Sequence, residues 1–334
     1  MLHPMVKGKV WGWIFALALF ICLPREASAG PKNIDLDKIG QRNINAGQIN
    51  FFSIDKEIAL GKELSVEVEQ SNRVLDDPEV TEYINRMGQN IVRNSDAQVP
   101  FVIKVIDSDE VNAFALPGGF FYVNTGLILA AQEESELAGV MAHEIAHVAA
   151  RHATEQFSKG RLFNLASIPL IFVGGPLGYG LQQAITLLVP LQFLQFSRGS
   201  EREADFLGLQ YLYRTGYDPQ SFISFFEKVS AQEKRKPGLL SRAFATHPMT
   251  KDRIYRAQKE IQELMPVREQ YVLNTSEFDH VRDRLKARNN SPANEGREAE
   301  SNRPQLKRTA QSSEESMGEE QTPTDNPPKL TRNP

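Results

Sequence analysis

Residues 143–147 read His-Glu-Ile-Ala-His, two histidines four positions apart with a glutamate beside the first. On an α-helix, residues four apart differ by about 40° in azimuth, so both imidazoles can reach one metal ion. Glu144 is offset by about 100° from His143 and about 60° from His147, which keeps its carboxylate beside the ion and available to a water molecule. The spacing predicts two ligands, His143 and His147, and a base, Glu144, rather than a helix whose histidines merely pack.

A catalytic zinc ion has three protein ligands and an open position for water, so a third ligand is needed. A metzincin would need glycine at position 150 and histidine at position 153, but the chain has alanine at both. His152 is one residue out of that register. We therefore expect His152 to support the site from outside or to lie on the surface.

A glutamate from a later helix is the other common third ligand. Glu201 and Asp205 lie four apart on one face of the next strong helical pattern. The spacing favours Glu201 as the ligand, with Asp205 accepting a hydrogen bond from a ligand histidine, although the reverse assignment stays open. Glu203 points elsewhere on that helix and is expected to be solvated.

The elements that must position these residues are mostly helices, because apolar residues recur with the helical period in six stretches. The longest pattern, 133–157, carries the two histidines, and Leu137, Met141, Ile145 and Val148 form its core stripe. Asp77 and Pro78 are typical of a helix start. The other patterns cover 53–70, 76–92, 200–216, 219–234 and 248–264.

Two short stretches, 100–107 and 119–126, are rich in β-branched and aromatic residues and predict strands around a turn at 117–119. Together with the helices they predict an α+β fold. The turn and strand are expected to form the substrate edge of the cleft, where an extended peptide could add as a strand. The residues named for this edge are Asn112, Ala113, Gly118 and Gly119.

Both ends of the chain are expected to lie outside the folded domain. Residues 1–29 resemble a cleavable signal peptide, with basic residues, an apolar run and a small-residue site, which predicts export, most simply to a periplasm; an uncleaved anchor is the alternative. Residues 30–49 form an N-terminal linker, 50–286 the catalytic domain, and 287–334 a disordered tail rich in Pro, Ser, Glu and Asn. The single cysteine, Cys22, lies in the signal, so no disulfide is expected.

The charge and hydropathy of the chain limit the classes of partner that it is expected to bind. The formal net charge is −4, which does not suggest a nucleic-acid binder. Residues 162–197 carry no charge, but glycines and prolines interrupt them, so no clean membrane-spanning helix is expected. We predict that they form buried or cleft-covering helices; a surface that touches a membrane or an apolar substrate is the alternative.

The stretches HEIAHV, FSRGSEREADFLGLQYL, NAFALPGGFFYVNTGLI and THPMTKDRI together resemble the gluzincin peptidases that include the CAAX prenyl protease, HtpX and the periplasmic beta-barrel assembly-enhancing protease. The resemblance covers residues 50–265 and implies a zincin-like domain with a small mixed sheet beside the active-site helix. It implies Glu201 as third ligand and Asp205 as its companion. It also places His247 near the metal, as a catalytic group that stabilises the oxyanion or occupies the open zinc position. Arg253 is a weaker candidate for contact with the oxyanion or a carboxylate.

The residues and the resemblance predict an endopeptidase with one Zn²⁺ per chain. Zinc lowers the pKa of water to about 7 and polarises a carbonyl, while Glu144 takes the water proton and returns it to the leaving amine. The expected substrates are unfolded or misassembled exported polypeptides, outer-membrane proteins among them, in protein quality control. The alternative is a zinc-stabilised chaperone or scaffold whose metal site is latent.

Overall fold

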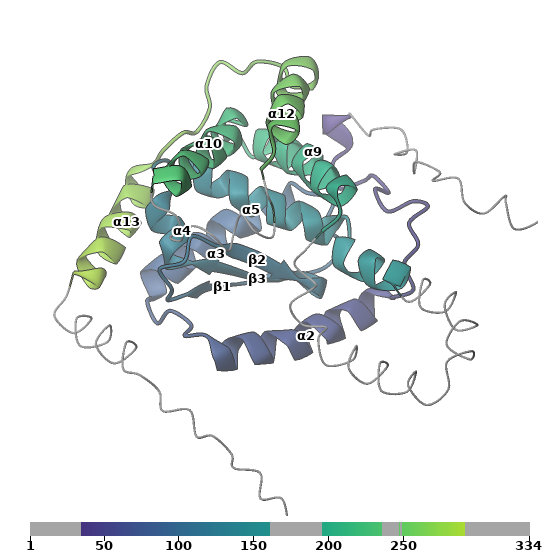
Figure 1. The fold of residues 1–334 in the computed structure, drawn as a ribbon, viewed down its shortest axis with the longest axis horizontal. Coiled ribbons are helices and arrows are strands. Elements are labelled where there is room, and N and C mark those ends of the chain that lie inside the picture. Colours follow the sequence, from purple (N-terminus) through teal and green to yellow (C-terminus); the bar gives the residue numbers. More distant parts are fainter. Residues whose placement is uncertain (1–34, 161–195, 236–246, 248, 291–334) are drawn as a thin grey trace, which may run out of the picture. The chain divides into compact units, whose positions relative to one another are not determined.

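A computed structural model describes residues 35–160, 196–235, 247 and 249–290 (Figure 1). The signal segment, the uncharged stretch up to residue 195 and the tail beyond residue 290 lie outside the described residues, so the predictions for them stay predictions, as do the predicted domain limits. The chain divides into two units, Met1–Ala287 and Arg288–Pro334, and the site lies within the first.

Helices dominate the described part of the first unit, and one small sheet completes it, which confirms the predicted α+β class. Asp77 accepts a hydrogen bond from the Val80 N–H and Pro78 occupies the first helical turn, as the sequence predicts. The final helix was not predicted. The helices are η1 (Leu36–Lys38), α2 (Ile54–Ser71), α3 (Pro78–Arg93), η2 (Pro117–Gly119), α4 (Thr125–Ala130), α5 (Glu134–Ala149), α9 (Arg198–Arg214), α10 (Gln220–Arg235), α12 (Lys251–Leu264) and α13 (Ser276–Asn289).

The sheet has the strand order β1-β3-β2, with β1 (Val102–Ile106) parallel and β2 (Ala113–Leu116) antiparallel to β3 (Phe120–Asn124). This mixed sheet confirms the prediction for β1 and β3, whereas β2 lies in a stretch that we predicted as a connection. The turn between β2 and β3 needs glycine. Gly118 has φ 74°, and a Cβ atom there would lie 2.5 Å from the Ile58 Cα atom of α2.

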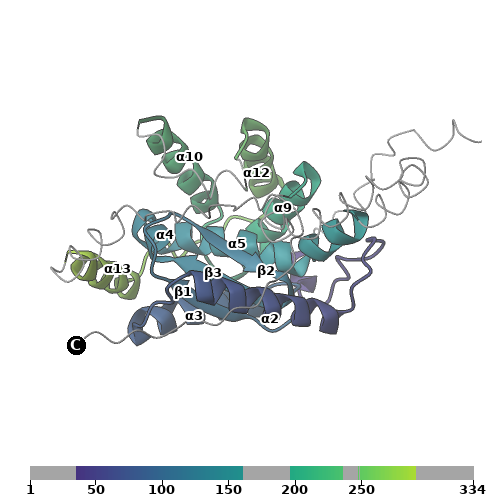
Figure 2. The same ribbon diagram turned by 60° about the horizontal axis from the view of Figure 1, so that its bottom comes forward.

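The two faces of the sheet pack against different helices. Leu116 and Tyr122 pack with Leu64 and Val68 of α2 on one face. Phe121 joins the main core, which α3 and α5 also enter. Figures 1 and 2 show the result: α2 runs beneath the sheet, and α5 lies between the sheet and the group formed by α9, α10 and α12.

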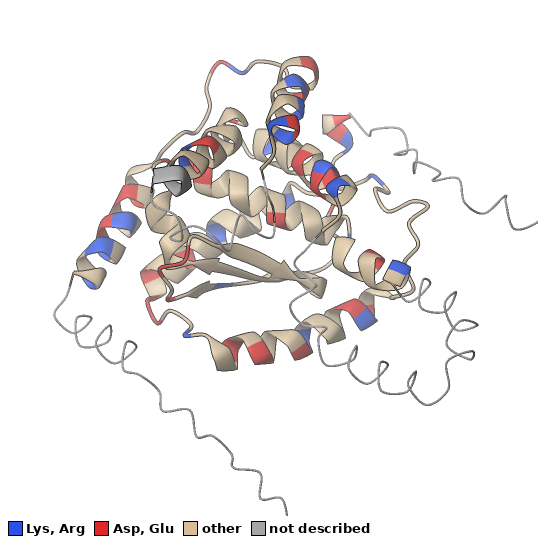
Figure 3. Cartoon of the chain, viewed as in Figure 1, with Lys and Arg blue, Asp and Glu red and all other residues tan. Residues whose placement is uncertain are grey.

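Helix α5 is the centre of the fold, because all sixteen of its residues are buried. The predicted stripe from Leu137 to Val148 is in the core, but the opposite side of the helix is covered as well. Charged residues are frequent along outer helices such as α2, α12 and α13 (Figure 3), whereas the acidic residues of α5 are buried. None of the described helices is long and apolar enough to cross a membrane.

The helix predicted over 133–157 is wrong in one respect, since α5 ends at Ala149. Arg151 adopts a left-handed backbone conformation, with φ 55°, and residues 152–160 then form a separate helical segment. Tertiary contacts hold this break: the Arg151 guanidinium donates to the Glu57 carboxylate at 2.7 Å and to the Phe52 carbonyl at 2.8 Å. The break decides where His152 lies.

Candidate active site

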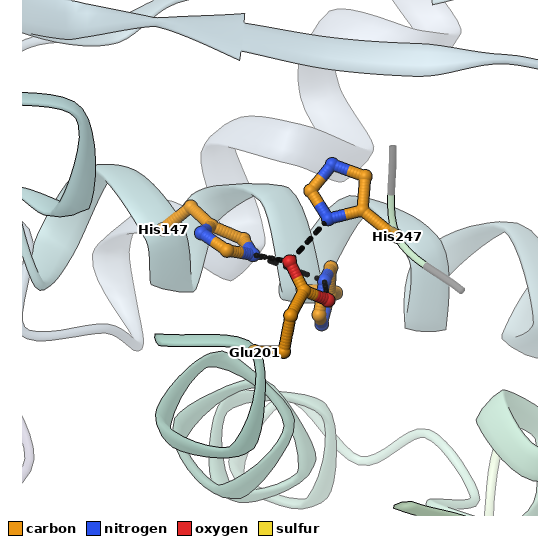
Figure 4. Close-up of side chains that lie close together, drawn as sticks. His147, Glu201 and His247 are labelled. Carbon is orange, nitrogen blue, oxygen red and sulfur yellow. Dashed lines mark hydrogen bonds and ion pairs between the residues drawn. The ribbon is translucent and has the colours of Figure 1, made fainter. Parts of the chain in front are cut away.

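Four buried side chains meet between α5, α9 and the segment before α12 (Figure 4). One ligand atom from each of His143, His147, Glu201 and His247 lies within 4.8 Å of the others. We call these four residues the ligand cluster. The first three are the predicted ligands and the fourth is the predicted catalytic histidine.

Two local features bring α5 and α9 together at the cluster. Ser197 caps α9 by accepting from the Ser200 N–H, which puts Glu201 in the first turn, where the helix dipole favours a carboxylate. Gly208 lies at a close contact between the two helices, since a Cβ atom there would be 3.1 Å from the His143 Cα atom. The absence of a side chain at Gly208 therefore sets the distance between the helices.

The ligand atoms lie close enough together to share one zinc ion. The Nε2 atoms of His143 and His147 are 3.1 Å apart. His143 Nε2 lies 3.7 Å from Glu201 Oε2, and His147 Nε2 lies 3.5 Å from the other carboxylate oxygen, Oε1. Zinc with bonds of 2.0–2.1 Å has neighbouring ligand atoms about 3.3 Å apart. Two imidazole nitrogens and one carboxylate oxygen are also a donor set that catalytic zinc uses.

His247 closes one side of the cluster. Its Nδ1 atom is 2.8 Å from Glu201 Oε1, and its Nε2 atom is 3.7 Å from Glu144 Oε1. Burial alone would lower the pKa of His247, but the carboxylates of Glu144 and Glu201 outweigh it and raise that pKa above its ordinary value. His247 can therefore hold a proton between the two carboxylates.

Glu144 lines a mainly apolar hollow. Burial raises the pKa of its carboxyl above the usual value, although His247 and His143 oppose the shift. Asn112 and Ala113, two of the residues predicted for a substrate edge, line the hollow, and their contact with a substrate stays a prediction. Gly118 and Gly119 do not: both are buried, against α2 and the segment before β1. The other lining residues are Val111, Leu127, Val140, His143, Phe225, Phe226 and His247.

Asp205 of α9 and Arg253 of α12 contact the cluster and each other. Asp205 Oδ1 is 3.1 Å from His143 Nδ1, the predicted position for orienting this ring. Arg253 donates to both oxygens of Asp205 at 2.7 Å and lies 2.8 Å from Glu201 Oε2. Burial would raise the pKa values of Asp205 and Glu201, but hydrogen bonds, from Arg253 to Asp205 and from His247 to Glu201, and nearby positive charges lower both. The structure thus directs Arg253 at carboxylates of the site, and its contact with an oxyanion stays a prediction.

Four further residues complete the surroundings of the two histidines. Phe222 stacks on His143 with ring centroids 5.8 Å apart, and Phe196 stacks on His147 at 4.2 Å. No spacing rule connects these phenylalanines to the motif, so the sequence did not suggest them. His152 is buried beside His147, and Glu203, which we expected to be solvated, is partly exposed and contacts His152.

The chain matches known peptidases over the part that carries this site. The model of peptidase family M48 matches residues 76–261. The beta-barrel assembly-enhancing protease of Escherichia coli is 32% identical over 276 residues, which are 78% of this chain and 53% of that protein. The homologous protein of Yersinia pestis is 31% identical over 225 residues, 64% of this chain and 46% of that protein. The mitochondrial metalloendopeptidase OMA1 of Schizosaccharomyces pombe is 31% identical over 230 residues, 67% of each chain. The chain spans about half the length of the beta-barrel assembly-enhancing proteases it matches.

Proposed function

The chain belongs to peptidase family M48, and we propose that it is a metalloendopeptidase that uses one zinc ion to hydrolyse unfolded or misassembled exported proteins. The observation that supports zinc most strongly is the close approach of the His143, His147 and Glu201 ligand atoms, a donor set that catalytic zinc uses. When bound, zinc supplies Lewis-acid chemistry, which polarises a carbonyl and makes a water molecule acidic.

The remaining chemistry falls to residues of the chain. Glu144 removes a proton from the attacking water and passes it to the leaving amine. Burial favours this role because it raises the pKa of the Glu144 carboxyl towards neutral pH, at which the carboxyl can both accept and donate a proton. Asp205 fixes the ring of His143, and Arg253 fixes Asp205. His247 can donate its proton to negative charge that develops on the substrate oxygen beside Glu144.

The edge strand β2 offers a backbone for the substrate. The Asn112 carbonyl accepts from the Asn124 N–H of β3, and hydrogen-bonded pairs alternate along an antiparallel ladder, so Ala113 and Ala115 present their backbone groups away from β3. A peptide that pairs there as an added strand would pass beside Glu144, because Ala113 and Glu144 line the same hollow. This mode reads main chain, which suits unfolded polypeptides, and the apolar hollow suits the apolar side chains that they expose.

The physiological setting is proposed from the names of the relatives. Beta-barrel assembly-enhancing proteases act, by name, in the assembly of barrel proteins, and the N-terminal segment predicts export. We assign this chain to the same kind of quality control in a periplasm, with outer-membrane proteins among its substrates. As part of the same proposal, residues 162–197 would contact a membrane surface.

The test is cleavage of an unfolded casein by the full chain, with zinc, with a chelator, and after zinc is restored. The Glu144→Gln variant should keep its zinc and lose roughly 10²–10⁴-fold in rate. Glu227→Gln is the matched control, because Glu227 is exposed on α10. A zinc-loaded wild type that cuts no unfolded protein would contradict the proposal.

A second function, a scaffold with a latent metal site, is favoured by one contact. His247 bonds to Glu201, a proposed ligand, and could hold the site closed. Complementation of a deletion strain separates the two functions. Full rescue by Glu144→Gln would support the scaffold, whereas loss of rescue with zinc content intact would support the peptidase.

A further inference from the structure

His152 lies on the side of His147 that faces away from the ligand cluster. The Nε2 atom of His147 points at His143 Nε2, and its Nδ1 atom lies 3.0 Å from His152 Nδ1. The two rings are nearly perpendicular, at 74°, and the His152 side chain is fully buried. Its remaining nitrogen, Nε2, lies 3.3 Å from Glu203 Oε2 on α9.

The end of α5 at Ala149 allows the contact between the His152 and His147 rings. In a continuous helix, residues five apart differ by about 140° in azimuth, so His152 would point away from His147. The left-handed Arg151 ends the helix and turns the chain, which brings the next residue back against the ligand ring. Arg151 itself is held by Glu57 and the Phe52 carbonyl, both outside α5.

One arrangement of protons satisfies both hydrogen bonds. If His147 offers the Nε2 lone pair to a metal, its proton must be on Nδ1, and it donates to the Nδ1 lone pair of His152. The His152 proton is then on Nε2 and is donated to the Glu203 carboxylate. Every donor in this chain has an acceptor, and the chain ends at a side chain that is 44% exposed.

We propose that His152 and Glu203 are a positioning pair that fixes the ring and tautomer of His147 and thereby sets the affinity of the site for its metal. The inference rests on the proposed ligand set. His152 would orient the ring of His147 as Asp205 orients the ring of His143. The chemistry of the two orienting groups differs, because Asp205 is a buried carboxylate held by Arg253, whereas His152 is a neutral ring that contacts the partly exposed carboxylate of Glu203. Groups that orient metal ligands typically contribute 10–100-fold to metal affinity.

Zinc affinity of the full chain, measured by competition with a chromophoric chelator, tests the pair. We expect His152→Phe, which keeps a ring but removes both nitrogens, to weaken zinc binding roughly 10–100-fold. His152→Asn places an acceptor oxygen near the position of Nδ1 and should recover most of this loss. Glu203→Ala should weaken binding several-fold, and Glu227→Ala, exposed on α10, should not change it. The visible spectrum of the Co²⁺-loaded protein should change in His152→Phe and Glu203→Ala and stay unchanged in Glu227→Ala.

Wild-type affinity in both His152→Phe and Glu203→Ala would overturn the proposal, and so would equal losses in the Phe and Asn variants. If His152→Phe does not fold, Glu203→Ala decides alone, and an affinity within about twofold of wild type overturns the pair. The measurement needs no substrate. An inactive protein with the expected pattern of affinities would therefore contradict the peptidase function and leave the positioning pair supported.

Discussion

Replacing Arg253 with methionine removes the guanidinium that lies between two carboxylates of the site. Arg253 is 5% exposed and makes two contacts of 2.7 Å to Asp205 and one of 2.8 Å to Glu201. Methionine has a similar length and no charge, so the substitution removes the positive charge with little change in packing. In the metal-free protein it leaves Asp205 and Glu201 without this compensation.

The expected loss of unfolding free energy is large in the metal-free protein and smaller in the zinc-loaded protein. Breaking a buried ion pair by removing one partner costs about 3–5 kcal/mol, and Arg253 serves two carboxylates. For a domain of this size that corresponds to a fall in Tm of roughly 6–20 °C. Bound zinc supplies positive charge beside Glu201, so the loaded protein should lose less. By linkage, the difference between the two losses equals the change in the free energy of zinc binding.

Thermal unfolding of the chelated and the zinc-loaded protein, with each variant beside wild type, measures both losses. Arg256→Met is the matched control, since Arg256 lies on the exposed side of the same helix and pairs with Asp252 at 2.9 Å. Its effect should stay within about 0.5 kcal/mol. The reasoning is refuted if Arg253→Met destabilises the metal-free protein no more than Arg256→Met, or if zinc leaves the loss unchanged.

Three further outcomes are expected. The carboxylates around His247 raise its pKa, so its protonated form stabilises the metal-free fold below about pH 6.5, and this stabilisation is lost as the pH rises through the raised pKa. The difference in unfolding free energy between wild type and His247→Gln should therefore shrink as the pH rises above about 6.5, and a constant difference in urea unfolding would contradict this. Gly208→Ala should push α9 away from His143 and weaken zinc binding about tenfold, while the gain in helix propensity, about 1 kcal/mol, offsets much of the loss of stability from overpacking. Gly199→Ala on the same helix is the control, and equal zinc affinities in the two variants would argue against the close contact. Zinc at a thousandfold excess over its dissociation constant should add about 4 kcal/mol of stability, and calorimetry that shows no gain would exclude the cluster as a binding site.

The chemistry of the site could be predicted where it is encoded on one helix. His143 and His147, like Glu201 and Asp205, are four apart, and helical geometry alone puts each pair on one face. The sheet was predicted in part, since β1 and β3 have strong strand composition, whereas β2 is a four-residue run, Ala-Phe-Ala-Leu, too short for a clear period.

What the sequence could not predict depends on contacts between distant elements. The end of α5 at Ala149 requires Arg151 to adopt φ 55°, and the groups that hold it are Glu57 of α2 and the Phe52 carbonyl. No local pattern records those contacts, and alanines on both sides favour a continuous helix. Which carboxylates Arg253 contacts, and which side chains His152 contacts, could not be predicted for the same reason, because these partners depend on how α9 docks against α12 and α5.

Complete burial of α5 shifts the pKa values of Glu144 and His147, which lie one turn apart, in opposite directions. Burial disfavours the charged form of any group, so it lowers the pKa of His147 well below the usual value and raises the pKa of Glu144. The first shift keeps the imidazole neutral, with a lone pair for a metal ion, and the second brings the carboxyl closer to the pH at which it must exchange a proton. One physical cause thus prepares a ligand and a base on the same helix. A substitution that admits water beside α5 should therefore weaken metal binding and proton transfer together, even if it touches neither side chain.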